Sequence, residues 1–277
     1  MVEDIIQEVA ERLSPLPCIE GVVLGGSRAR GSHTEDSDID IGIYYNPDSL
    51  DLDGINQVAA QLDDEHRSNL VVPPGGWGPW VNAGGWLVIG GYPVDLILRD
   101  INRVKQVMQD TEQGIVTTNY QPGHPHGYIS TMYRGELAIS KVLYSRNNDF
   151  YELKKRAEIY PIELQKAMLG FFMFEADFSL LHAKANAEAG DRYHVAGHIF
   201  RSVSGLNQVL FACNRAYCIN EKRAVRLIDT LERKPADYSG KVNRIFAALG
   251  VSLQECCDLT EELYSEVKEI VAAVTNG

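Results

Sequence analysis

The sequence predicts an α/β (α+β) domain with a mixed sheet, followed by an all-helical bundle domain. Over the first half of the chain, short apolar runs alternate with segments of helical spacing. After the polar stretch SRNND, residues 145–149, the segments are long, helical in spacing and poor in turn signals. A single hydrophobic core stops growing near the length of this chain, 277 residues. We therefore predict two domains, residues 1–147 and 148–277.

The first-domain elements follow from the spacing of apolar residues. Gly90 and Gly91 separate two apolar runs, which predicts a tight hairpin turn. Pro93 has no amide donor, so its strand should lie at an edge there or contain a bulge. The other expected elements are helices at residues 3–13 and 55–62 and strands at residues 19–24 and 39–45.

The second domain should consist of long helices. Helical spacing continues over residues 161–187, 194–216 and 252–273. We find no internal repeat, which excludes a solenoid.

Negative charge is concentrated in the first half of the chain. Residues 1–145 contain 9 Lys and Arg against 20 Asp and Glu, and the remainder contains 17 against 18. The negative electrostatic potential of the first half would repel a nucleic acid backbone and attract a cationic small molecule. No apolar run is long enough to cross a bilayer, and the amino terminus is acidic and amphipathic, so a cytoplasmic protein is expected. The five cysteines show no zinc-type spacing, and buried thiols are the expected state.

Asp38 and Asp40 are separated by one residue at the start of an apolar run. Side chains two residues apart in a strand point to the same face, so these carboxylates lie together while Ile39 and Ile41 point into the core. Neighbouring carboxylates need a shared proton or a bound cation, and rigidly held oxygen ligands suit Mg²⁺. A solvated acidic strand end is the alternative interpretation.

The loop before this pair has the composition of an anion-binding loop. Gly25 and Gly26 let the backbone approach a ligand closely, and Ser27 adds a hydroxyl. Residues 28–30 would open a short helix whose amide groups face an anion. A Mg²⁺ ion held by Asp38 and Asp40 would bind the phosphates that this loop also contacts, so the carboxylates and the loop would serve one polyphosphate. The alternative interpretation is that the glycines only form a tight turn.

The stretch GGSRARGSHTEDSDIDI, residues 25–41, resembles the signature of the polymerase-beta-like nucleotidyltransferase superfamily. The two-domain plan is similar to that of its aminoglycoside and lincosamide adenylyltransferases. The resemblance implies that Gly26 and Ser27 hold the nucleotide phosphates and that Asp38 and Asp40 hold two Mg²⁺ ions. The superfamily takes a third carboxylate from a neighbouring strand, and Asp95 in YPVDLIL matches it in context. Read without the family, Asp95 could equally be a turn former at a strand end.

Two further residues resemble functional positions of these enzymes. Lys222 in CINEKRAVRLI resembles a lysine that opens a helix in the streptomycin-type adenylyltransferases and touches the triphosphate, although a lone lysine is usually solvated surface. Glu175 in FFMFEADF matches a glutamate that accepts the proton of the substrate hydroxyl, and apolar neighbours should raise its pKa. Core packing around a polar seam is the alternative for Glu175, and Asp177 or Glu136 could be the base instead.

The resemblance implies a magnesium-dependent nucleotidyltransferase. Its substrates would be ATP or another nucleoside triphosphate and a hydroxyl of a small molecule such as an aminoglycoside or lincosamide antibiotic, with pyrophosphate released. The two alternatives are a toxin–antitoxin component that adenylylates a partner protein and a nucleotide-binding module without activity. The acceptor, the nucleotide base and the oligomeric state are left open.

Three other groups of residues have a structural and a functional interpretation. His124 and His126 could bind a metal ion, but the surrounding Pro and Gly favour a rigid loop. The tryptophans Trp77, Trp80 and Trp86 could stack on a ligand ring, although packing in the hairpin is favoured. Arg192 and His198 have the spacing of the ribonuclease motif of HEPN domains, a match that often arises by chance.

Overall fold

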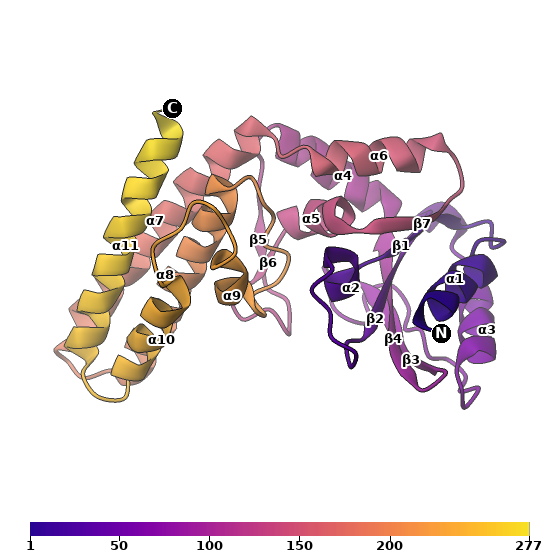
Figure 1. The fold of residues 1–277 in the computed structure, drawn as a ribbon, viewed down its shortest axis with the longest axis horizontal. Helices are drawn as coiled ribbons and strands as arrows, with labels where there is room; N and C mark the ends of the chain where they lie inside the picture. The colour runs from indigo at the N-terminus through magenta and orange to yellow at the C-terminus, as the bar shows by residue number, and fades with distance from the viewer. Residues whose placement is uncertain (277) are drawn as a thin grey trace. The chain divides into compact units, whose positions relative to one another are not determined.

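The computed structural model describes residues 1–276, which form two compact units (Figure 1). Unit 1 comprises Met1–Gln109, Asn119–Gly123 and Tyr133–Ile159; unit 2 comprises Asp110–Thr118, His124–Met132 and the described chain from Tyr160. A mixed sheet in unit 1 and a helical carboxyl-terminal region in unit 2 confirm the predicted fold class. The division into domains 1–147 and 148–277 stays a prediction.

Unit 1 is built on a five-stranded sheet with the order β3-β4-β2-β1-β7. Strands β2 and β4 are parallel, and the other neighbouring pairs are antiparallel. The strands are β1 (Ile19–Leu24), β2 (Ile39–Tyr45), β3 (Ala83–Ile89), β4 (Tyr92–Asp100) and β7 (Lys141–Ser145). The runs predicted at residues 19–24 and 39–45 are thus confirmed as strands.

Helices α1 (Val2–Leu13) and α3 (Leu52–Leu62) pack on one face of this sheet (Figure 1). Both are amphipathic, and their apolar stripes meet the side chains of β2 that alternate toward this face. Asp51 caps α3, since its carboxylate accepts a hydrogen bond from the Gly54 amide at 2.8 Å. The fully buried contributors to this core include Val9, Leu13, Ile39, Ile41, Ile43, Ile55 and Ala59.

The opposite face of the sheet is also covered. Tyr44 of β2 packs edge-on against Phe150 of α6 (Asn148–Glu158), with ring centroids 5.0 Å apart. Arg99 of β4 pairs with Glu136 of α5 (Thr131–Ile139) through two hydrogen bonds of 2.7 and 2.8 Å. A sheet covered on both faces explains why its strands are nearly continuous apolar runs.

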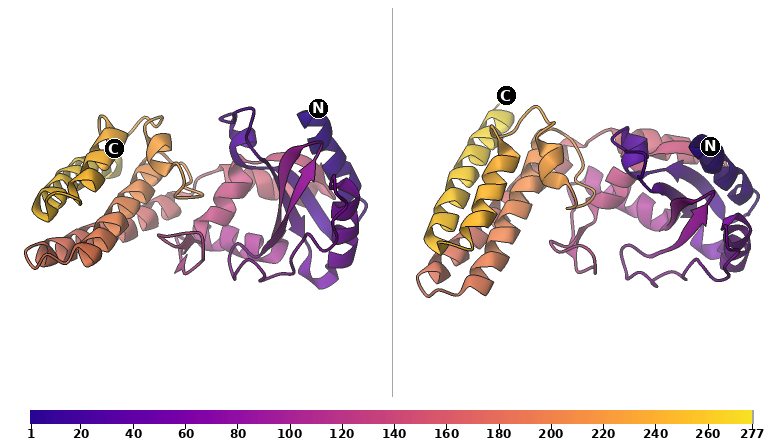
Figure 2. Two further views of the ribbon diagram at one scale, coloured as in Figure 1. Left: turned by 90° about the horizontal axis from the view of Figure 1, so that it is seen from below. Right: turned by 60° about the horizontal axis from the view of Figure 1, so that its bottom comes forward.

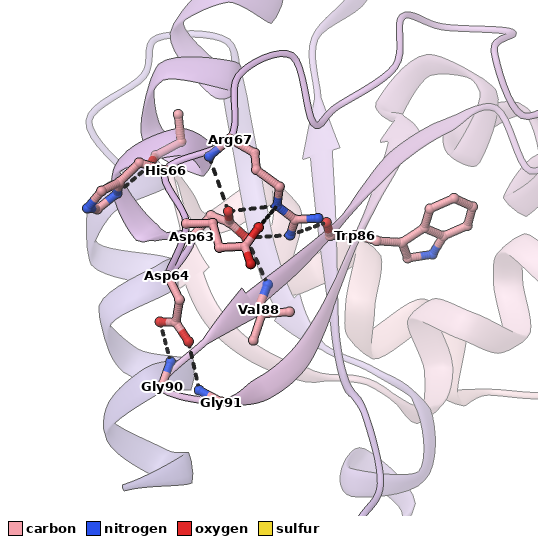
Figure 3. Close-up of polar contacts among 10 residues, drawn as sticks. Asp63, Asp64, His66, Arg67, Trp86, Val88, Gly90 and Gly91 are labelled. Atoms are coloured by element: carbon pink, nitrogen blue, oxygen red, sulfur yellow. Dashed lines mark hydrogen bonds and ion pairs between the residues drawn. The ribbon is translucent and has the colours of Figure 1, made fainter.

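The predicted hairpin is present, and an acidic pair fixes its position (Figure 3). The Asp64 carboxylate accepts hydrogen bonds from the amides of Gly90 and Gly91, both of which have positive φ. Asp63 is fully buried, and its carboxylate accepts hydrogen bonds from Arg67 Nη2 at 2.6 Å and from the Val88 amide at 3.0 Å. These contacts tie the end of α3 to the tip of the hairpin.

Pro93 lies where β4 extends beyond the start of its pairing with β2. The pairing of β2 with β4 begins at Ile39 and Val94, whereas β3 already pairs with Pro93 through Val88. Proline therefore occupies a locally unpaired side of the strand, as its missing amide requires.

Asp63→Asn is expected to lower the free energy of unfolding at pH 7 by roughly 1–3 kcal/mol. The hydrogen bond from Arg67 lowers the pKa of Asp63 against the opposing effect of burial, with the Val88 amide lowering it further. The pKa of Asp63 in the folded protein is thus below its value of about 3.9 in the unfolded chain. The ionised carboxylate therefore stabilises the fold fully above about pH 3.9, and this contribution is lost as the pH falls through the folded pKa. Urea unfolding of parent and variant between pH 7 and pH 3 should show their difference shrinking with acid.

Glu65→Gln is the matched control for this substitution. Glu65 reaches Arg67 only at 3.9 Å and is 80% exposed, so its removal should change the unfolding free energy by less than about 0.5 kcal/mol. A pH-independent difference for Asp63→Asn would mean that the charge of Asp63 does not stabilise the hairpin.

Unit 2 is a helical bundle in which α7, α8, α10 and α11 pack along one another (Figures 1 and 2). Gly205 lets α8 lie close to α7, because a Cβ there would be only 3.0 Å from the Phe172 carbonyl oxygen. Ser202 of α8 adds a buried hydrogen bond to the Ala176 carbonyl at 2.9 Å. The long helices predicted at residues 161–187, 194–216 and 252–273 are confirmed as α7 (Ile162–Ala187), α8 (Arg192–Cys213) and α11 (Leu253–Thr275).

The remaining elements are short or lie between the predicted ones. They are α2 (Gly26–Arg30), the 3₁₀ turn Pro47–Ser49, α4 (Ile101–Glu112), β5 (Thr118–Asn119), β6 (Tyr128–Ile129), α9 (Ala224–Ile228) and α10 (Tyr238–Ala248). All five cysteines are buried free thiols, as expected. Over residues 1–276, no helix combines the length and apolar character needed to span a membrane.

Candidate active site

Asp40 and Asp95 are direct neighbours across the two parallel strands of the sheet. The register of β2 and β4 pairs these two residues. Both are half-buried, while Ile39 and Ile41 beside Asp40 are fully buried on the other face. In-register residues of adjacent strands are about 4.8 Å apart and point to the same face, so two carboxylates meet here. The resemblance implied that Asp95 lies on a strand next to the acidic pair, but the pattern of residues alone did not predict this register.

Asp38 lies just before β2 and is exposed. Its backbone carbonyl accepts a hydrogen bond from Arg28 Nε at 3.1 Å, and the Ser37 carbonyl accepts one from Arg28 Nη2 at 2.5 Å. Arg28 is itself buried. The arginine therefore holds the segment that carries Asp38, a role that the sequence did not reveal because its partners are carbonyl groups nine and ten residues away.

Gly26 opens α2 directly against the carboxylate of Asp40. Its φ of +57° is in the left-handed region, and a Cβ placed on it would overlap Asp40 Oδ2. The preceding Gly25 donates its amide to the Asp40 carbonyl at 2.8 Å. Ser27 follows in the same turn and is half-buried. The glycine loop and the acidic strand end thus form one contiguous surface of unit 1.

The donor chemistry of this surface suits a hard cation. Two neighbouring carboxylates on rigid strands offer oxygen ligands of the kind that Mg²⁺ takes. Within residues 1–276, no three His, Cys, Asp or Glu side chains are already grouped so that they could hold a metal ion.

Glu175 lies in unit 2, buried between two basic side chains. Its Oε2 is 3.3 Å from His126 Nε2, and its Oε1 is 2.5 Å from Arg201 Nη2. Burial would raise the pKa of Glu175, but the hydrogen bond from His126 and the charges of His126 and Arg201 lower it overall. The expectation of a raised pKa was therefore wrong, because the residues that surround this carboxylate in space are basic and lie far away in sequence.

The two alternative bases have different surroundings. Glu136 is held by the bidentate contact with Arg99, which occupies both of its carboxylate oxygens. Asp177 is exposed on α7. Neither observation assigns a catalytic role to these residues.

Lys222 is exposed in the segment before α9 in unit 2. Its backbone amide donates to Asn220 Oδ1 at 2.8 Å, and Arg223 then adopts a left-handed conformation at φ 65° before the helix begins. The neighbouring Glu221 is half-buried and accepts hydrogen bonds from the His126 amide and His124 Nδ1.

The histidines and tryptophans for which the sequence allowed both a structural and a functional interpretation make contacts within the protein. His124 pairs with Glu221 at 3.0 Å and His126 with Glu175, so both imidazoles hold their loop within unit 2 through carboxylates. Trp77 and Trp86 stack on each other with centroids 4.8 Å apart. Packing, the favoured interpretation for both groups, agrees with these contacts.

Part of the chain matches a known domain family. Residues 2–116 match the family model of the nucleotidyltransferase domain. Among solved structures, a nucleotidyltransferase-like protein from Exiguobacterium sibiricum is similar over 99% of this chain and 75% of its own, with 11% identity and a TM-score of 0.47. A search of the curated proteins finds no match.

The matched region contains all the elements described for unit 1 up to α4, including the glycine loop and the Asp40–Asp95 pair. Residues 2–116 therefore form a nucleotidyltransferase domain.

Proposed function

We propose that the chain transfers AMP from ATP to a hydroxyl group of a small molecule. The hydroxyl oxygen forms a bond to the α-phosphorus, the bond to the bridging oxygen of the β-phosphate breaks, and pyrophosphate leaves with that oxygen. The observation that carries this proposal is the register pairing of Asp40 with Asp95 beside the glycine loop of the matched domain.

In this proposal, Asp38, Asp40 and Asp95 are the metal ligands. The carboxylates of β2 and β4 are oxygen donors of the right type, and Arg28 positions the segment that carries Asp38. When bound, two Mg²⁺ ions would supply Lewis-acid stabilisation of the transferring phosphate and lower the pKa of the acceptor hydroxyl.

Gly26 and Ser27 are the proposed phosphate-binding residues. The positive φ of Gly26 and the Asp40 carboxylate at the position of a Cβ both require glycine here, so the backbone of the loop lies directly against a proposed metal ligand. The Ser27 hydroxyl adds a donor in the same turn. Lys222 is proposed to neutralise the triphosphate tail, which agrees with its exposure.

Glu175 is the proposed acceptor of the hydroxyl proton. Its lowered pKa keeps it ionised at neutral pH, so it is in the state that can accept a proton, although it is a weaker base than a carboxylate with a raised pKa. His126 and Arg201 hold its two oxygens in fixed positions.

An acceptor screen tests this proposal. ATP, GTP, CTP and UTP would each be combined with Mg²⁺ and a panel of aminoglycosides and lincosamides, and each acceptor would be weighed by mass spectrometry. We expect a gain of one nucleoside monophosphate with ATP and simultaneous release of pyrophosphate. Pyrophosphate release that depends on a partner protein, with every small molecule unmodified, would contradict a small-molecule acceptor and favour protein adenylylation.

The acceptor is expected to be cationic, so its kcat/KM should fall as salt rises from about 50 to 500 mM. The excess of acidic residues in the first 145 residues attracts a polycation, and added salt screens this attraction. A lincosamide, which has a single positive charge, is the matched comparison and should respond less. A flat salt profile with the true acceptor would contradict electrostatic attraction while leaving nucleotidyl transfer untouched.

A further inference from the structure

Two histidines of α8 bring ring nitrogens together outside the nucleotidyltransferase domain. His194 and His198 are four residues apart in the helix, so their side chains project from the same face. Their Nε2 atoms lie 3.1 Å apart. His194 is exposed and His198 is half-buried, so an ion can reach the pair from solvent.

The spacing of the two nitrogens fits a shared metal ion. Histidine binds Zn²⁺ at about 2.0–2.1 Å, and two such bonds at a tetrahedral angle place the nitrogens about 3.3 Å apart. Without an ion, one imidazole must donate to the other. The hydrogen-bonding capacity of the pair is then only partly used, because His198 Nδ1 is buried and has no hydrogen-bond partner within residues 1–276.

The surroundings favour two protein ligands and not three. His182 of α7 stacks on His198 with ring centroids 5.1 Å apart and planes at 17°. The nitrogen lone pairs of an imidazole lie in its plane, so a stacked ring does not aim at the ion of its neighbour. This agrees with the finding that residues 1–276 hold no preformed group of three ligands.

The nearby charges do not oppose a cation strongly. Arg201 acts electrostatically on His198, but its guanidinium is paired with the Glu175 carboxylate at 2.5 Å. Asp191 accepts a hydrogen bond from the His194 amide at 3.1 Å and so caps the first turn of α8, which carries the His194 imidazole.

We propose that His194 and His198 form a two-histidine chelate for a divalent transition metal ion of the Zn²⁺, Ni²⁺ or Cu²⁺ class. Imidazole ligands select these ions over Mg²⁺, so the site is chemically distinct from the acidic site of unit 1. Water completes the coordination. A bound ion links two successive turns of α8 and stabilises the start of this helix.

Calorimetric titration of the tag-free full chain with NiCl₂ in excess Mg²⁺ tests the proposal. We expect one Ni²⁺ per chain, with His194→Ala and His198→Ala each weakening the Kd by at least about tenfold. His182→Ala is the matched control and should leave the Kd within about twofold, because it removes a stacked ring and no ligand. His194→Gln separates loss of the ligand from loss of bulk and should weaken binding as His194→Ala does.

The proposal also predicts a rise in the thermal unfolding midpoint of the parent on adding Ni²⁺, and no rise in the double variant His194→Ala, His198→Ala. Absence of Ni²⁺ binding by the parent would overturn the chelate. Equal weakening by His182→Ala would also overturn it, as would unchanged binding by the double variant, which would place the ion elsewhere. Circular dichroism of each variant without metal checks that α8 still folds.

Discussion

Asp40→Asn is expected to lower kcat/KM for nucleotidyl transfer by at least about 10³-fold while leaving the fold intact. The side chain is half-buried beside Asp95 on the neighbouring strand, and asparagine keeps its shape. The variant loses a negative charge at the point where the proposed metal would neutralise the phosphates. Asp95→Asn should have a similar effect, because the register places it equivalently on β4.

The fold of Asp40→Asn gives an independent check. Neighbouring like charges across two strands are unfavourable, so without Mg²⁺ the free energy of unfolding should be unchanged or slightly higher in the variant. With Mg²⁺ and ATP present, only the parent should gain stability from binding. Thermal unfolding with and without both ligands therefore separates a loss of binding from a loss of structure.

Asp36→Asn is the matched control for Asp40→Asn. Asp36 is an exposed acid in the loop before β2, four residues before Asp40. Its substitution changes the net charge equally but removes no proposed ligand, so activity should remain within about twofold. Turnover of Asp40→Asn within tenfold of the parent would rule out its role as a metal ligand, whatever the control does.

The local elements and the location of the acidic cluster could be predicted from the sequence. Apolar periodicity identified α1, β1, β2 and the three long helices, since each buries a regular stripe or run. The hairpin at Gly90 was equally visible, because positive φ at two successive positions restricts the residues allowed there. These features depend only on local chemistry.

The contacts between distant segments could not be predicted in the same way. Asp40 and Asp95 meet only because β2 and β4 pair in one particular register. The basic neighbours of Glu175 come from positions 49 residues before it and 26 residues after it, so the local apolar context gave the wrong direction for its pKa. Spatial neighbours, and not sequence neighbours, set the charge environment of a buried group.

Gly26→Ala is expected to reduce kcat/KM by at least about 10²-fold, because the new Cβ would overlap the Asp40 carboxylate. Either the loop or Asp40 must move, and both belong to the proposed phosphate and metal site. The substitution also places a side chain at φ +57°, which costs about 1–2 kcal/mol of stability. These two effects must be separated before the loss of activity can be assigned to the site.

Gly31→Ala separates them. Gly31 ends the same short helix at φ +72°, and a Cβ there meets no atom within 4 Å. It should therefore show only the stability loss that comes from a side chain at positive φ, about 1–2 kcal/mol, and keep activity within about threefold. Denaturant unfolding and nucleotide KM would be measured for both variants in parallel. If Gly31→Ala loses as much activity as Gly26→Ala, strain in the loop explains both, and the contact between Gly26 and Asp40 has no special role in binding the nucleotide.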